Sequence, residues 1–502
     1  MHVWLGLLKF QLSQQSQRKI MRKILLITAA LLCLQSTLLS GQNITENEAI
    51  ESQIKLLQLW IGETMDYYHI PGLAIGIVYD QDLIWSKGFG YADLETHEPI
   101  TPQTLFRIAS ISKLFTSMAI MQLRDAGKLQ LDDPLRKHLK WFTIKNEFKD
   151  GPEISIRQVL THSSGLPREA AFPYWTDHVF PSREELIKAL PDQEMIFEPE
   201  TRWKYSNLGM ALLGEVVSRV SGMSYEDYIQ KKILQPLNMG DTRIQLKETD
   251  MFKLATGYLR FFPDRPREVA PFTDSKALTP AANFSSNVED LARFIAFHLS
   301  EDQMPSVMKR STRREMQRVQ WLQPHWKSGW GLGFSISRDG ERTLVGHGGW
   351  VAGYRSQIVF SPGEKIGVIV LMNTEDFSPF TIAKKALTML APVIRGAQPS
   401  APEAVPDTSA WLSYVGRYID TSYWETEVLV LNKRLYLYDY GLPANEDPQS
   451  ALRELFYTGQ PHIYRLSGEN GNGEKVIFEM EEGAVKRIKI GENYIFPYPN
   501  KK

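Results

Sequence analysis

The stretch FRIASISKLFTSMAIMQL, residues 106–123, carries the pattern that decides the fold. Ser110 and Lys113 match S-x-x-K, and the apolar residues from Leu114 to Leu123 predict a helix that begins near Ser110. Three positions apart on a helix, the two side chains lie on one face. Free backbone N–H groups at the helix start would stabilise negative charge near Ser110. A desolvated Lys113 can take the serine proton, so the stretch predicts a serine nucleophile with a lysine base.

An isolated S-x-x-K match also fits an N-capping serine followed by a solvated lysine. Three further segments change this interpretation: LTHSSGLP at 160–167, YSN at 205–207 and GHGG at 346–349. In this order, the four segments resemble the signatures of class C β-lactamases, D-alanyl-D-alanine carboxypeptidases and related esterases. The resemblance covers roughly residues 46–395. It implies a serine hydrolase that works through an acyl-enzyme and needs no cofactor or metal.

The YSN segment supplies two further candidate residues. Tyr205 can shuttle a proton between Ser110 and the leaving group if cations such as Lys113 favour its phenolate. Asn207 offers its amide to the substrate carbonyl and to Lys113. The alternatives are a packing role for Tyr205 and a turn role for Asn207.

The GHGG segment is expected to form the opposite wall of the site. Gly348 and Gly349 have no side chains, so a substrate amide or ester can lie along the strand edge as an added strand. The backbone N–H groups of Trp350 and Ser110 are expected to form the oxyanion hole. His347 stands where most true β-lactamases have lysine, and its charge can change between about pH 5 and 8. We therefore expect inefficient hydrolysis of antibiotics that carry a carboxylate.

Two other residues of these segments receive no catalytic role. His162 is interpreted as a structural histidine, because Lys113 and Tyr205 already provide the base. Glu200 stands where the related proteins commonly have glycine, and we expect its effect to be confined to a loop.

Apolar periodicity outlines one antiparallel sheet with helices around it. Spacings of three and four predict helices at 46–68 and 380–394. Strand-like runs lie at 73–78, 83–90, 343–345, 354–360 and 366–372. Helical patterns fill much of the chain between the second and third runs. The sequence therefore predicts an α/β sandwich in residues 43–395, with an all-helical insert between two sheet halves. The resemblance implies that this sandwich is β-lactamase-like.

A second domain is predicted after a linker. Residues 396–410 include Pro399, Pro402 and Pro406, a composition that favours neither helix nor strand. Residues 411–502 consist of short strands and turns, which predict a small β-barrel or sandwich. Examples of the strand-like runs lie at 427–431, 434–438, 475–480 and 485–490, with turns at 470–471 and 482–483.

The first 42 residues have the pattern of a signal peptide. Basic residues at 18–23 precede the apolar run from Ile24 to Leu39, which is shorter than the ~20 residues that span a bilayer. Met21 is a better start than Met1, because it shortens the basic region. The only cysteine, Cys33, lies in this run, so we expect a mature chain without thiols. We expect an exported protein of a bacterial envelope, periplasmic or extracellular, without a stable membrane span.

Composition limits the class of partner. The 57 basic residues nearly cancel the 58 acidic ones, which argues against nucleic acid and favours a small-molecule substrate. The sequence lacks HExxH, phosphate-loop and G-x-S-x-G motifs. Three functions stay open: hydrolysis of esters or D-amino-acid peptides, hydrolysis of β-lactams, and silent binding of cell-wall peptides.

Overall fold

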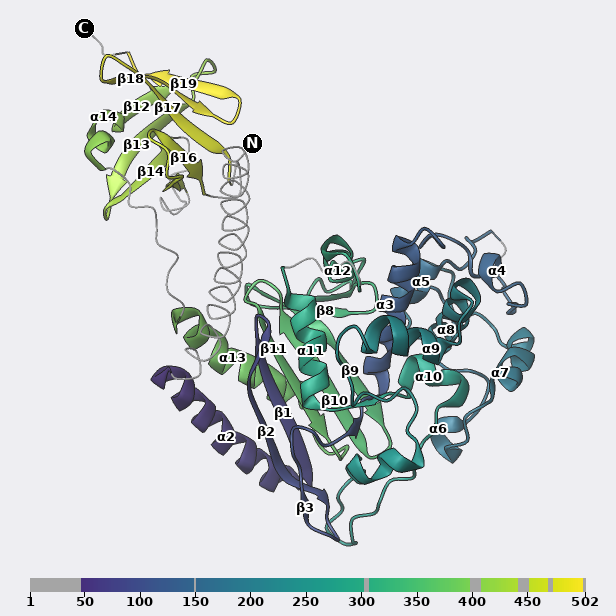
Figure 1. Cartoon of the computed structure of the whole chain (residues 1–502). Coiled ribbons are helices and arrows are strands. Elements are labelled where there is room, and N and C mark those ends of the chain that lie inside the picture. The colour runs from purple at the N-terminus through teal and green to yellow at the C-terminus, as the bar shows by residue number, and fades with distance from the viewer. Residues whose placement is uncertain are drawn as a thin grey trace, which may run out of the picture. The chain divides into compact units, whose positions relative to one another are not determined.

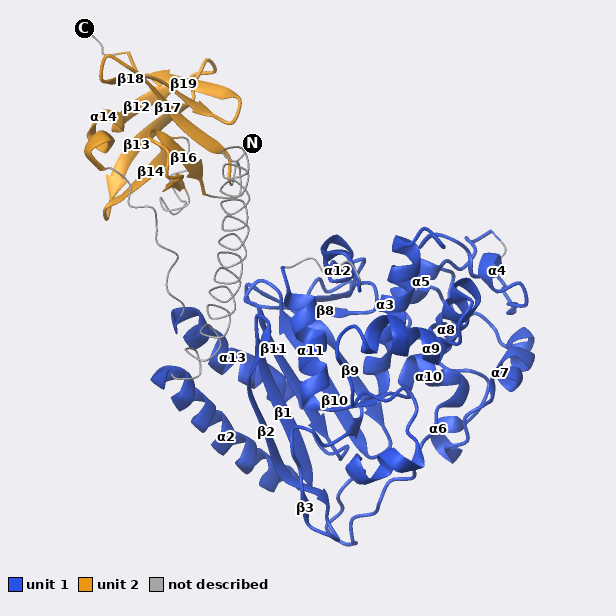
Figure 2. Ribbon diagram, viewed as in Figure 1, with its two compact units in different colours: residues 1–397 blue, residues 398–502 orange. Residues whose placement is uncertain are grey.

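The computed structural model describes residues 47–148, 150–301, 307–397, 408–440, 451–467 and 473–499. The chain forms two compact units, residues 1–397 and 398–502 (Figure 2). The predicted signal peptide, Cys33, the three linker prolines and the turn at 470–471 lie outside the described residues. None of the described helices is both long enough and apolar enough to cross a membrane.

Unit 1 is built around a nine-stranded sheet with the order β3-β2-β1-β11-β10-β9-β8-β7-β6, and its strands pair antiparallel. The early strand β1 therefore lies beside the late strand β11. The bounds are β1 (Gly72–Tyr79), β2 (Asp82–Asp93), β3 (Glu98–Pro99), β6 (Trp321–Leu322), β7 (Ser328–Trp330), β8 (Ser335–Asp339), β9 (Arg342–Val351), β10 (Tyr354–Ser361) and β11 (Ile366–Met372).

Helices cover both faces of this sheet (Figure 1). Leu73, Ile75 and Ile77 of β1 pack with α2 (Glu48–Tyr68) and α13 (Pro379–Ala397) in one core cluster. Ala74 belongs to the other cluster, together with the helices of the opposite face. Successive strand residues point to opposite faces, so burial on both faces explains why β1 and β11 are almost continuously apolar.

The chain between β3 and β6 forms the insert, which is mostly helical and also contains a two-stranded sheet of β4 (Phe106–Arg107) and β5 (Ser285–Ser286). Its helices are α3 (Ser112–Asp125), α4 (Leu135–His138), α5 (Ile156–Leu160), α6 (Tyr174–Asp177), α7 (Arg183–Ala189), α8 (Asn207–Ser221), α9 (Tyr225–Ile229), α10 (Thr279–Ala282), α11 (Val288–Leu299) and α12 (Arg310–Met316). The predicted α/β sandwich is thus confirmed, whereas the insert, which we expected to be all-helical, also contains this short sheet.

Unit 2 is a closed eight-stranded barrel with one short helix, α14 (Trp411–Tyr414). The all-β prediction is confirmed, and the structure adds β12, β15, β16 and β19 to the predicted strands. The bounds are β12 (Gly416–Ile419), β13 (Glu425–Leu431), β14 (Arg434–Asp439), β15 (Leu452–Tyr457), β16 (Ile463–Leu466), β17 (Lys475–Glu481), β18 (Ala484–Ile490) and β19 (Asn493–Pro497).

Two local differences from the sequence prediction have simple causes. Helix α13 continues through Gly396 to Ala397, beyond the predicted start of the linker, because its apolar stripe is buried as far as Ile394. Strand β9 runs to Val351 rather than ending at Val345, because pairing with β10 carries it through the glycines. The segment with His347 is therefore a strand.

Candidate active site

The nucleophile segment connects β4 to α3. Ser110 lies in a short 3-10 helix, Ala109–Ile111, that leads directly into α3. Ala109 has a φ of 45°, in the left-handed region that costs a non-glycine residue free energy. Ser112 holds this conformation, since its hydroxyl donates to the Ala109 carbonyl at 2.6 Å and accepts from the Phe284 N–H at 3.0 Å. Ser110 thus lies on a turn whose strained backbone is held by the hydrogen bonds of Ser112.

Lys113 lies one turn further along, with only 1% of its surface exposed. Its Nζ donates to Ser110 Oγ at 3.0 Å and to the Ala281 carbonyl at 2.8 Å. Burial lowers the pKa of Lys113 well below its usual value, with a smaller opposing effect from Glu169. A buried amine at this distance can exist in the neutral form that accepts a serine proton.

Tyr205 lies over the lysine, with Lys113 Nζ 4.8 Å from the centre of its ring. Burial raises the pKa of its phenol above the usual value, although a hydrogen bond with Ser110 acts in the opposite direction. The phenolate that we expected from the neighbouring lysine is therefore disfavoured, and this part of the expectation is corrected. Tyr205 is suited to donate a proton and then recover it.

Asn207 begins α8 and is buried. Its Nδ2 donates to both oxygens of Glu169, at 2.7 and 3.0 Å. The expected contact with Lys113 is not among the hydrogen bonds of the described residues, where the lysine donates to Ser110 and Ala281 instead. Asn207 Oδ1 is buried without a partner in the described part of the chain.

Strand β9 brings the GHGG segment against the nucleophile. Pairing with β8 stops at Gly346, whereas pairing with β10 continues to Val351, so one edge of the segment from His347 onward has no β8 partner. A Cβ added at Gly349 would lie 2.2 Å from the Ile108 carbonyl oxygen. Glycine is thus required at position 349 because strand β9 passes so close to the nucleophile segment. We had expected glycine here for a different reason, namely to make room for the substrate. Trp350 follows, 42% exposed.

We expect Gly349→Ala to lower kcat/KM for a small ester by roughly 10²-fold, because misplacing a reacting group by about 1 Å costs that much. The new methyl group would also lie 2.3 Å from Ser356 Oγ, so the nucleophile segment must move. Gly363→Ala, in the turn between β10 and β11, is the control, since no atom lies within 4 Å of the place that its methyl group would take. Steady-state kinetics and Tm of both variants test this; wild-type activity in Gly349→Ala would show that the strand yields without moving Ser110.

His347 is buried, with 4% of its surface exposed. Its Nδ1 lies 2.6 Å from the Gly348 carbonyl oxygen, which can only accept, so Nδ1 carries the proton. Burial, assisted by the charge of Lys113, lowers the pKa of His347 to about 3. This lowered pKa differs from our expectation that the charge of His347 changes between about pH 5 and 8, because burial disfavours the cation.

Since the imidazole is neutral above a pKa of about 3, we expect His347→Gln to leave the shape of the pH profile of kcat/KM unchanged between pH 5 and 8. Neutral esters measured at half-unit steps are suitable substrates. If one limb of the profile disappears in the variant, the imidazole titrates in this range after all.

His162 forms part of the aromatic packing behind Tyr205. The two rings lie 4.4 Å apart, and Trp330 lies 5.0 Å from the histidine on another side. His162 Nδ1 accepts from the Ser206 N–H at 3.2 Å, and burial lowers the pKa of the imidazole. These contacts fit the structural role. Glu200 has a φ of 65°, which explains why glycine is common at this position.

The structure adds residues that the motifs did not indicate. The Ala281 carbonyl binds Lys113, and a backbone group leaves no sequence signal. Glu375 accepts from Trp350 Nε1 at 2.9 Å and from the Gly353 N–H at 3.0 Å, and so fixes the end of β9. Glu169 contacts Asn207. Its position, two residues after LTHSSGLP, is the one local sequence feature that could have indicated a place in the site.

This fold, with a serine and a buried lysine beside a tyrosine, defines an active-site-serine protein of the β-lactamase and penicillin-binding type. Residues 57–391 match the family model described as Beta-lactamase, which is more than half of the chain. The chain therefore belongs to the Beta-lactamase family, whose members are generally serine hydrolases.

Three relatives extend the comparison. The chain is 29% identical to Beta-lactamase-like protein 2 of Dictyostelium discoideum over 68% of its own length and 63% of that protein, thus less than two thirds of that relative. It is 26% identical to Penicillin-binding protein 4* of Bacillus subtilis, over 81% of this chain and 92% of that one. A solved octameric penicillin-binding protein homologue from Pyrococcus abyssi has a TM-score of 0.61 at 28% identity, covering 88% of this chain and 99% of that one.

Proposed function

We propose that this protein is an exported serine hydrolase that cleaves esters or D-amino-acid-containing peptides through a Ser110 acyl-enzyme. The observation that carries the proposal is the buried Lys113 amine, 3.0 Å from Ser110 Oγ. A catalytically silent binding protein would usually have lost Ser110, Lys113 or Tyr205, and all three are present.

Acylation would begin when neutral Lys113 takes the Ser110 proton and Oγ attacks the substrate carbonyl. The backbone N–H groups of Ser110 and Trp350 would stabilise the oxyanion. As the bond to the leaving group breaks, Tyr205 gives that group a proton and recovers one from protonated Lys113. The leaving group departs with the proton from Tyr205, the former serine proton replaces it on Tyr205, Lys113 is neutral again, and the acyl group stays on Ser110.

Deacylation would use the same residues in reverse. Water takes the place of the leaving group, and the neutral pair of Lys113 and Tyr205 accepts its proton as it attacks the ester carbonyl. Breakage of the bond to Oγ returns the proton to Ser110. The products are a carboxylic acid and the original enzyme.

The charges around the site favour neutral substrates over substrates that carry a carboxylate, which include penicillins and peptides with a free D-alanyl-D-alanine end. His347 is neutral in the physiological range, because burial lowers its pKa to about 3. Arg168 lies 5.0 Å from the Tyr205 ring, but Glu169 pairs with it at 3.0 Å. A substrate carboxylate would therefore find little uncompensated positive charge here.

Three probes distinguish the candidate activities. The purified protein is incubated separately with a labelled penicillin, a p-nitrophenyl ester and a D-alanyl-D-alanine peptide, and adducts are mapped by mass spectrometry. We expect turnover of the ester with an adduct on Ser110, and slower turnover of the peptide, because its terminal carboxylate meets the same lack of positive charge as that of a penicillin. A stable penicillin adduct without turnover of any probe would favour silent binding, and fast penicillin turnover would favour a β-lactamase.

Export rests on the sequence of residues 1–42 alone. We propose removal of this segment and a final location in the periplasm or outside the cell. Amino-terminal sequencing of the protein from a bacterial envelope fraction tests this, and a mature chain that still contains Cys33 would contradict it.

A further inference from the structure

A carboxylate outside the sequence motifs lies inside the candidate site. The Glu169 side chain is 21% exposed and pairs with Arg168 at 3.0 Å. Both of its oxygens accept from Asn207 Nδ2, and the Tyr174 hydroxyl donates to Oε2 at 2.5 Å. Three side chains hold Glu169, so it is placed to support its neighbours rather than to bind a substrate cation.

The contact with Glu169 decides which way the Asn207 carboxamide faces. An ionised carboxylate only accepts hydrogen bonds, so the amide nitrogen must lie on its side. Asn207 Oδ1 then faces away, and this atom is buried without a partner among the described residues. A buried acceptor without a donor costs free energy, so this orientation of the carboxamide needs a firm contact at its nitrogen end.

We propose that Glu169 is a positioning residue of this site: it holds the Asn207 carboxamide with Nδ2 toward the carboxylate and Oδ1 turned away from it, and its negative charge acts on Lys113. The proposal rests on the function proposed above, because positioning matters only if Ser110 and Lys113 react.

The charge of Glu169 also acts on the base. Burial has the largest effect on the pKa of Lys113 and lowers it, Glu169 raises it, and Arg168 lowers it. The other titratable groups that face the lysine are uncharged at neutral pH: the raised pKa of Tyr205 and the lowered pKa values of the two histidines keep them neutral. These histidines are His162 and His347.

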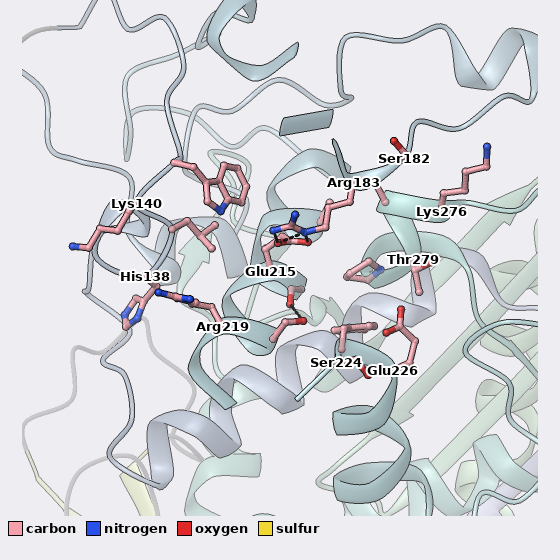
Figure 3. A pocket seen from close by; sticks show the side chains of 18 residues that line it. His138, Lys140, Ser182, Arg183, Glu215, Arg219, Ser224, Glu226, Lys276 and Thr279 are labelled. Carbon is pink, nitrogen blue, oxygen red and sulfur yellow. Dashed lines mark hydrogen bonds and ion pairs between the residues drawn. The ribbon is translucent and has the colours of Figure 1, made fainter. Parts of the chain in front are cut away.

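Two variants separate positioning from charge. Glu169→Gln keeps an oxygen that can accept from Asn207 but removes the charge, so the pKa of Lys113 should fall further. Glu169→Ala removes both. The matched control is Glu215→Gln: Glu215 is 24% exposed and pairs with Arg183 at 2.7 Å. It lies on the same helix as Asn207, about 12 Å further along the axis, in a pocket of the insert (Figure 3).

The first measurement does not depend on turnover. The full-length protein is labelled with ¹³C and ¹⁵N lysine, and Lys113 is titrated by NMR, its signal assigned by its absence in Lys113→Met. We expect a lower midpoint in Glu169→Gln and an unchanged midpoint in Glu215→Gln. Crystal structures of Glu169→Ala should show the Asn207 carboxamide in a different orientation.

Kinetics provide the second measurement. With a p-nitrophenyl ester, the acidic limb of kcat/KM should move to lower pH in Glu169→Gln, and Glu169→Ala should lose roughly 10²-fold at the plateau. An unchanged Lys113 midpoint in Glu169→Gln, together with an unmoved Asn207 in Glu169→Ala, would overturn the proposal. If the wild type turns over no substrate, the proposed function fails, whereas the titration and the crystal structure still decide the role of Glu169.

Discussion

Replacing Ser110 by alanine is expected to abolish acyl-enzyme formation and to lower kcat for any ester or peptide substrate by at least a factor on the order of 10³. Ser110 Oγ is the oxygen that Lys113 Nζ contacts at 3.0 Å, and alanine leaves no atom to acylate. The readouts are single-turnover kinetics and the mass of the intact protein after incubation with substrate.

Ser117→Ala is the matched control for this experiment, since its hydroxyl donates to the Lys113 backbone carbonyl within α3 at 2.8 Å. Its activity should stay within a few-fold of the wild type. Unchanged ester hydrolysis in Ser110→Ala would overturn the assignment of the nucleophile, and an adduct on another residue would identify its replacement.

Replacing Lys113 is expected to cost nearly as much as replacing Ser110, on the order of 10³-fold or more in kcat/KM. Lys113→Met removes the base and keeps most of the side-chain volume. Burial lowers the pKa of Lys113 well below that of a lysine in the unfolded chain. At pH 7 the lysine is therefore protonated in the unfolded chain, whereas folding disfavours its protonated form. Removing the buried amine relieves this cost at pH 7 but also removes the hydrogen bonds to Ser110 and Ala281, so we expect only a small change in stability.

Stability and activity can thus be measured on the same variant. A large fall in Tm together with a fall in activity would mean that Lys113 mainly supports the fold. The loss of activity should follow the first-order rate of acylation rather than KM, because the lysine acts in the chemical step.

Tyr205 and Lys113 are expected to act as one unit. Tyr205→Phe should cost less than Lys113→Met, because the raised pKa of the phenol makes the lysine the primary base. The double variant should be little worse than Lys113→Met alone. Strict additivity of the two losses would tell against a shared proton relay.

Much of the fold was determined by local sequence patterns. The spacing of apolar residues predicted α2 from Ile50 onward, and runs of branched residues predicted β1 and β11. These patterns are sufficient to predict such elements, because a helix or a strand buries one face and its apolar residues therefore repeat with the period of that element. Strands β12, β15, β16 and β19 were not among the runs named from the sequence, since short strands of a barrel depend on partners far along the chain for their pairing.

The candidate site divides in the same way. The sequence by itself determined which residue types come together, because S-x-x-K, Y-x-N and GHGG are local motifs in a fixed order. Only the tertiary structure decided their protonation states and orientation: the low pKa of His347, the neutral phenol of Tyr205, and the Asn207 carboxamide turned by Glu169. Desolvation and hydrogen bonding depend on what surrounds a group in space, and the neighbours of these residues come from segments that lie far apart along the chain.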